Sequence, residues 1–281
     1  MFKNLQVLFM RNVKLFFTDK RRMIMTFFSP IVTVFIFILF GRYLFEQSVK
    51  GLNNIDKMKF ADGSLLVGLM GMTTLTNGIS LSVFMVQDSE KKIFNDFSIT
   101  PIKTSTIRLS YLLFNCLLNI WICLMMFIII IVYMALRGTI GILSGNKSLY
   151  VYLIIILGGI MNSVLFTFVL SYLKSVSAFS AISGALSSVS GFFIGAFIPL
   201  TILPLWLNGI ATVIPTTQIV SLMKWVVFSD IDAYKMFASQ YKLSIATLDV
   251  NWWQSLIYVL SFTVFVIGLS SVLNFTWKKK R

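Results

Sequence analysis

The sequence predicts an all-α integral membrane protein with six transmembrane helices. Of its 281 residues, 57% are hydrophobic and only 12% are charged, whereas about 25% of the residues of a soluble domain are charged. So few charges cannot cover the surface of a water-soluble globule. Long segments without Asp, Glu, Lys or Arg recur along the chain. Helices are expected in them, because lipid offers backbone groups no hydrogen-bond partner.

Five of these charge-free segments are 19 to 28 residues long, which suits one span each, since about 20 apolar residues cross the hydrocarbon core. A sixth has 49 residues, and its Pro199, Pro204 and Pro215 disfavour a second continuous helix. We expect one span there, followed by an outer re-entrant hairpin at 199–222. The predicted spans, within one transmembrane domain over 1–281, are 23–45, 64–86, 107–135, 149–173, 178–198 and 252–276.

The basic residues predict the orientation. With six spans both termini lie on one side, together with 15 of the 24 Lys and Arg, and the positive-inside rule makes that side cytoplasmic. Apolar residues at helical spacing over 2–17 predict an amphipathic interfacial helix that carries Arg11 and Lys14 among membrane lipids. The net charge of +14 therefore reflects topology, and no nucleic-acid partner is expected.

Little catalytic chemistry is expected in the spans. Histidine is absent, and Cys116 and Cys123 lie in one apolar segment where packing is their expected role. No catalytic residue and no metal site is predicted. The predicted spans also lack a deeply placed charged residue, which disfavours an intramembrane enzyme and an ion-coupled secondary transporter.

Neutral polar and small residues remain as candidates. The polar residues either form interhelical hydrogen bonds or line a translocation path for an amphipathic substrate. Small residues in the fifth span permit close helix packing, within the subunit or at a dimer seam. The path candidates are Thr73, Asn77, Asn115, Asn119, Asn162 and Thr167, and the packing candidates are Gly184, Ser188, Gly191 and Gly195.

A short polar segment separates the second and third spans. Residues 89–99 predict a short amphipathic helix on the cytoplasmic side, which ends before Pro101 because the residue before proline disfavours helical geometry. Ile93, Phe94 and Phe97 form its apolar face. From the residues alone, this helix either rests on lipid headgroups or contacts a cytosolic partner.

Asp88, Glu90 and Lys91 precede this helix in the pattern D-x-E-K, and Thr100-Pro101 follow it. This pattern resembles the cytoplasmic loop of the type-2 ABC exporter permeases, which reads D-x-E-[KR]-G, then a short apolar helix, then Thr-Pro. Lys92 stands where that family usually has Gly. The helix at 2–17 is similar to the family's elbow helix. The resemblance implies an outer gate at Pro199, Pro204, Trp206 and Pro215, and an ATPase-coupling helix at 89–99 with the residues Asp88, Glu90, Lys91, Ile93, Phe94, Phe97, Thr100 and Pro101.

The resemblance also implies the partners. A permease half in a bacterial cytoplasmic membrane would pair with a second permease subunit, itself or a paralogue, and with a cytosolic ABC ATPase that binds ATP and Mg²⁺. This chain would bind no cofactor. An uncharged path in a chain with 14 Met and 27 Phe favours a hydrophobic or amphipathic export substrate, such as a drug, an antimicrobial peptide or a lipid-like toxin. The alternatives are a permease for polysaccharide or lipid-linked glycan export, and a non-transporting assembly or sensor protein.

Overall fold

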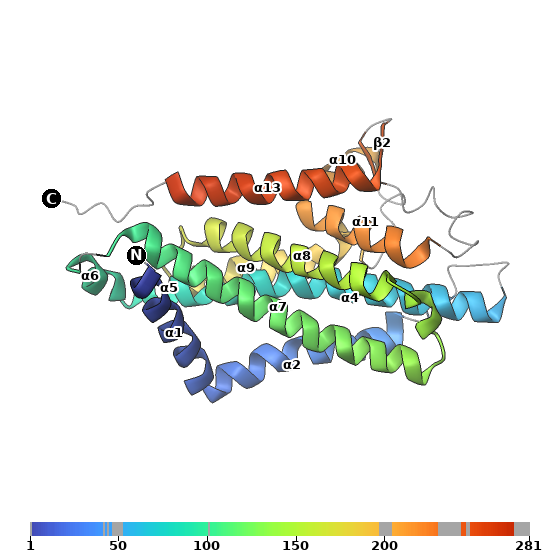
Figure 1. The fold of residues 1–281 in the computed structure, drawn as a ribbon, viewed down its shortest axis with the longest axis horizontal. Helices are drawn as coiled ribbons and strands as arrows, with labels where there is room; N and C mark the ends of the chain where they lie inside the picture. The colour runs from blue at the N-terminus through green and yellow to red at the C-terminus, as the bar shows by residue number, and fades with distance from the viewer. Residues whose placement is uncertain are drawn as a thin grey trace.

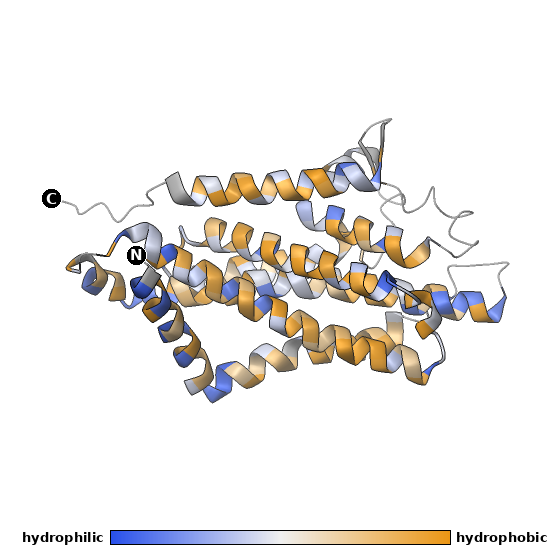
Figure 2. Ribbon diagram, in the orientation of Figure 1, coloured by the Kyte–Doolittle hydropathy of each residue, from blue (hydrophilic) through white to orange (hydrophobic). Residues whose placement is uncertain are grey.

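The computed structural model describes residues 2–41, 43, 45–46, 53–100, 102–196, 204–229, 243–245 and 248–272. Within them, six helical segments are long and apolar enough to cross a membrane. They run along the long axis of the molecule (Figure 1). Hydrophobic residues cover most of their length, and hydrophilic residues gather toward the two ends (Figure 2). The predicted all-α integral membrane fold with six spans is confirmed.

The spans follow the chain in order. They are α2 (Lys20–Ile36) with the π-helical turn η1 (Phe37–Gly41), α4 (Asn54–Leu81) with α5 (Val83–Glu90), α7 (Thr104–Leu136), α8 (Lys147–Leu170), α9 (Val176–Phe193) and α13 (Trp252–Val272). Each predicted span overlaps one of them. The predicted positions 42, 44, 197–198 and 273–276 lie outside the described residues.

Helix α4 forms the centre of the bundle and packs against α7, α8, α9 and α11 (Pro215–Phe228). The most apolar stretch of this span is 78% buried, whereas the corresponding stretches of the spans with α2 and α9 are 18% and 17% buried. Helices α2 and α9 therefore lie at the periphery. Close approach at the centre requires glycine. A Cβ on Gly78 would lie 2.9 Å from the backbone of Asn162 in α8, a distance that leaves no room for a larger side chain.

Helix α1 (Phe2–Thr18) leaves the bundle and packs against α7. Its Leu8, Asn12 and Phe16 are buried, one helical turn apart, while Val7 and Phe17 are exposed. One side of this helix packs on the protein, and apolar residues on another side are exposed. Such a helix suits a position in the membrane interface. Its placement there remains a prediction.

Two helices form a bent pair at the end of the bundle opposite α1. Helix α10 (Leu205–Val213) meets α11 at 87°, and Pro215 occupies the first turn of α11, where its missing N–H costs nothing. This is the shape expected of a broken hairpin at 199–222. Pro204 precedes α10 and Trp206 is 68% exposed, while Pro199 lies outside the described residues.

Short elements complete the fold. A 3₁₀ turn, η2 (Ile140–Leu143), joins α7 to α8, and an antiparallel pair, β1 (Leu243–Ile245) and β2 (Leu248–Val250), precedes α13. The two strands were not expected from the sequence. Below, the "α6 end" is the end of the bundle with α1 and α6 (Ile93–Ser98), and the "α10 end" is the opposite one (Figure 1).

Candidate functional site

The segment between the second and third spans is not one helix. Helix α5 ends at Glu90, Lys91 and Lys92 form a turn, and α6 begins at Ile93. The single helix predicted over 89–99 is therefore wrong. Lys92 has φ 58°, in the left-handed region, which glycine adopts without the steric cost of a Cβ. This accounts for the glycine usual at this position in the family that the sequence resembles.

Asp88 lies at the meeting point of three helices. Arg11 of α1 donates from Nη1 to Asp88 Oδ2 at 2.8 Å, and the hydroxyl of Tyr111 on α7 donates to the same carboxylate. The Asp88 side chain is 11% exposed and that of Arg11 27%. Burial opposes the charge on Arg11, but its hydrogen bond to Asp88 and the neighbouring charges outweigh burial, so the pKa of Arg11 is raised.

The aromatic side of α6 packs inward. Phe94 is buried with its ring 6.1 Å from that of Tyr111, and the guanidinium of Arg11 lies 5.5 Å from the centre of the Phe97 ring. We call Arg11, Asp88, Phe94, Phe97 and Tyr111 the Asp88 cluster. Its two Phe residues hold α6 against α1 and α7 and do not point away from the protein.

The outward side of α6 differs from the predicted apolar face. It carries Lys91, Lys92, Asn95, Asp96 and Ile99, all exposed, with Ile99 at 86%. Ile99 was not among the coupling residues that the resemblance implied. The only large apolar side chain on this described surface is therefore one that follows α6.

Further bonds join the segment to the spans. Glu90 Oε1 accepts from the backbone N–H of Val176, the first residue of α9, at 3.1 Å. Arg22 of α2 donates to Gln87 Oε1 at 2.8 Å, and its guanidinium lies 4.5 Å from the centre of the Phe84 ring. Arg22 and Gln87 were not among the predicted residues.

The remaining predicted residues of this region take minor places. Thr100 donates to the Phe97 carbonyl at 2.7 Å and so closes α6, and Ile93 is half-buried. Lys14 is exposed on α1. Pro101 lies outside the described residues.

A polar groove runs between α2, α4 and α9. Its volume is about 550 Å³, and Arg22 lies at its α6 end. The other lining residues are uncharged, and hydroxyl and amide groups are prominent among them. They are Met25, Thr26, Pro30, Thr33, Met72, Thr73, Thr76, Asn77, Ser80, Ser187 and Ser188. Of the predicted path residues, Thr73 and Asn77 thus share one groove.

The other predicted path residues lie outside the polar groove at contacts between helices, although Thr167 also lines a second cavity between α7, α8 and α13. Asn119 donates to the Thr74 carbonyl at 3.0 Å and to Ser163 Oγ at 3.1 Å, and Asn115 donates to Thr167 Oγ1 at 2.7 Å. In the same way Asn162 accepts a 2.6 Å bond from Thr216 of α11. These bonds fit the interhelical alternative of the sequence analysis, and a transport role for Asn115, Asn119, Asn162 and Thr167 stays a prediction.

A comparison with known protein families supplies the class. The family model described as "ABC-2 type transporter" matches residues 3–228, from α1 to the end of α11. The chain belongs to the ABC-2 type transporter family. It is the multi-pass membrane permease of an ABC transporter and not a catalytic subunit, and the family implies association with an ABC ATPase subunit. A search of curated proteins finds no match.

The packing residues of this ABC-2 permease separate into two groups. Gly184 and Ser188 are exposed on α9, and a Cβ on Gly184 would meet nothing within 4 Å. Gly191 and Gly195 are buried, and Gly195 has φ 66°. Only the first two therefore lie on a surface that a second subunit can reach.

A buried cation of the permease was missed. Lys224 of α11 is buried and donates from Nζ to the Gly195 carbonyl at 2.9 Å, at the end of α9. The carbonyl end of a helix carries a partial negative charge, which stabilises a cation placed there. The sequence analysis looked for buried charges only within the six predicted spans. It therefore overlooked this lysine, which lies in the bent pair. No group of His, Cys, Asp or Glu suited to a metal ion occurs in the described part of the chain.

Proposed function

We propose that this permease is half of an ATP-driven exporter, which carries hydrophobic or amphipathic compounds out of a bacterial cell. The observation that supports this most is the set of contacts around α5 and α6. Bonds from Gln87, Asp88 and Glu90 reach α2, α1 and α9, and Tyr111 adds α7. A displacement of this short segment therefore acts on four helices, two of which border the polar groove.

The ATPase would bind the outward surface of the segment. Ile99 supplies an exposed apolar centre, and Lys92, Asn95 and Asp96 surround it with polar groups, an arrangement typical of small protein interfaces. The ATPase would hold ATP and Mg²⁺. Its nucleotide-dependent states would shift the permease between inward- and outward-facing conformations, through contacts that differ between the two.

The polar groove is the proposed half of the translocation path. Two of the helices that line it, α2 and α9, are the least buried of the six spans, so a second permease subunit, identical or a paralogue, would cover it. Hydroxyl groups beside Met25 and Met72 suit a ligand with both polar and apolar parts. The bent pair with Pro204, Trp206 and Pro215 would form the outer gate, and both termini would be cytoplasmic.

A crosslinking experiment tests this assignment. Ile99→Cys places a thiol on the proposed ATPase surface, and Leu136→Cys places a matched one at the α10 end, since these side chains are 86% and 84% exposed. The native Cys116 and Cys123 are buried and stay silent. In native membranes, a thiol reagent that carries a photoactivatable group, which needs no cysteine on the partner, should join the ABC ATPase to Ile99→Cys alone.

Two other results would contradict the proposal. Crosslinking of the ATPase from Leu136→Cys but not from Ile99→Cys would invert the orientation and remove α6 from coupling. An Ile99→Cys protein that yields no ATPase adduct, although the ATPase copurifies with the permease, would place the docking surface elsewhere.

A further inference from the structure

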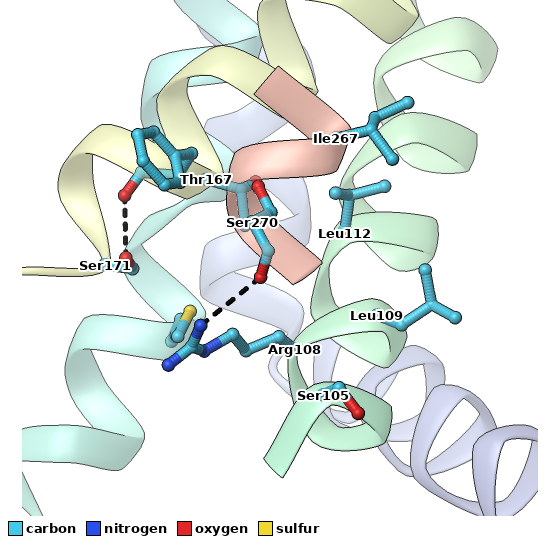
Figure 3. A pocket seen from close by; sticks show the side chains of 10 residues that line it. Ser105, Arg108, Leu109, Leu112, Thr167, Ser171, Ile267 and Ser270 are labelled. Carbon is cyan, nitrogen blue, oxygen red and sulfur yellow. Dashed lines mark hydrogen bonds between the residues drawn. The ribbon is translucent and has the colours of Figure 1, made fainter. Parts of the chain in front are cut away.

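A second cavity lies away from the polar groove, at the α6 end, between α7, α8 and α13. Its volume is about 310 Å³. Ser105, Ser171 and Ser270 border it, and Leu109, Leu112 and Ile267 form apolar walls (Figure 3). The side chain of Arg108 extends across it and donates to the Ser270 carbonyl at 3.4 Å (Figure 3). Met85 of α5 also lines this cavity, and Arg108 is not among the residues that line the polar groove.

The cation of the cavity lies toward the α6 end of the bundle, and Leu112 and Ile267 lie deeper, with Thr167 as a polar group at their level. Ser105 and Arg108 lie in the first two turns of α7, and Ser270 and Ser171 lie at the ends of α13 and α8. Leu112 is about 10 Å deeper along α7 than Ser105, at 1.5 Å per residue. The cavity therefore has a cation at the level of the lipid headgroups and mostly apolar walls toward the hydrocarbon core.

We propose that this cavity binds an anionic phospholipid of the cytoplasmic leaflet. The phosphate would lie against the Arg108 guanidinium, and one acyl chain would follow Leu109, Leu112 and Ile267. A guanidinium has five N–H donors in a geometry that suits phosphate oxygens, so Arg108 can keep its bond to Ser270 while it holds the lipid. The choice of leaflet rests on the orientation proposed above.

Charge and size both favour a phospholipid over a neutral amphiphile. Lys174 is exposed three residues beyond Ser171, which borders the cavity, so a second cation lies near the lining of the cavity in the sequence. At about 310 Å³ the cavity is at the small end of ligand pockets. It accommodates a phosphodiester and the start of one chain, and the rest of the lipid would cover the exposed face of α13 at Val264 and Phe265.

Lipid titration of the purified full-length chain tests this inference. The chain is delipidated in detergent and titrated with phosphatidylglycerol, or with phosphatidylcholine of the same acyl chains, and native mass spectrometry counts the bound lipids. One phosphatidylglycerol should bind with preference. Arg108→Gln should weaken that binding about fivefold, the preference that one basic side chain gives an anionic lipid, without changing phosphatidylcholine binding.

Matched variants separate a built site from diffuse charge. Lys103→Gln removes an exposed cation near Arg108 in the sequence and should change the affinity less than twofold. Arg108→Lys should retain most of the preference, and Ser105→Trp should block the cavity while the charge remains. Equal effects of Arg108→Gln and Lys103→Gln, or equal binding of the two lipids by the unmodified chain, would refute the site. Release of a non-phospholipid amphiphile from this cavity in native membranes would refute the assigned occupant, whether or not an ATPase is bound.

Discussion

The pair Arg11–Asp88 should contribute measurably to the docking of α1 on the bundle. Removing one partner of a fully buried ion pair costs about 3–5 kcal/mol, whereas an exposed pair contributes about 1 kcal/mol or less. With side chains 27% and 11% exposed, and with Tyr111 as a further donor to Asp88, this pair belongs between those limits. We expect a coupling free energy of about 2 kcal/mol between the two residues.

Hydrogen exchange in nanodiscs measures this coupling. A loss of about 2 kcal/mol should raise the exchange of α1 amides about 30-fold when exchange follows local opening. Arg11→Gln and Asp88→Asn should each have this effect, and the double variant should exchange little faster than either one. Lys14→Gln, an exposed cation one turn along α1, is the control. Additive effects of the two substitutions, or equal exchange in Arg11→Gln and Lys14→Gln, would refute the reasoning.

Three further outcomes follow from local geometry. Lys92→Gly should stabilise the turn between α5 and α6 by about 1 kcal/mol, because φ 58° suits glycine. Lys92→Val should destabilise the same turn, because a β-branched residue disfavours this φ. Hydrogen exchange of the α6 amides measures both effects. Gly78→Ala should lower the melting temperature in detergent, since its Cβ would meet the Asn162 backbone at 2.9 Å, while Gly184→Ala should leave it unchanged. Lys224→Met should free the end of α9 and raise the protease sensitivity near Gly195, and an unchanged cleavage pattern would remove that bond from any gating role.

The spans could be predicted because the membrane imposes a constraint that composition records. A segment without charge that is about 20 residues long has few alternatives to a helix in lipid. The same reasoning found the break near Pro215, since proline prevents a continuous helix there. This reasoning gave no information on Lys224, which ends a charge-free segment in the sequence. Lys224 lies in the core because α11 packs against α4 and α8.

The segment of α5 and α6 shows the limit of what local sequence patterns can predict. Glycine at position 92 would have indicated the left-handed turn, but Lys92 gives no such signal, and one helix over 89–99 was the simpler prediction. Ile93, Phe94 and Phe97 do form one side of α6, yet periodicity cannot say whether that side meets a partner or the chain itself. Arg11 and Tyr111, distant in sequence from α6, decide that it packs inward.

The same contacts indicate how the segment acts on the polar groove. Arg22 lines the groove at its α6 end and also donates to Gln87 of α5, beside Asp88. Glu90, two residues beyond Asp88, holds the first residue of α9, whose Ser187 and Ser188 form another wall of the groove. A rotation of α5 and α6 relative to α7 cannot keep both bonds and leave the groove unchanged. We therefore expect the width of the groove at its α6 end to follow the position of α5 and α6, which is the relation that the proposed ATP-driven transport requires.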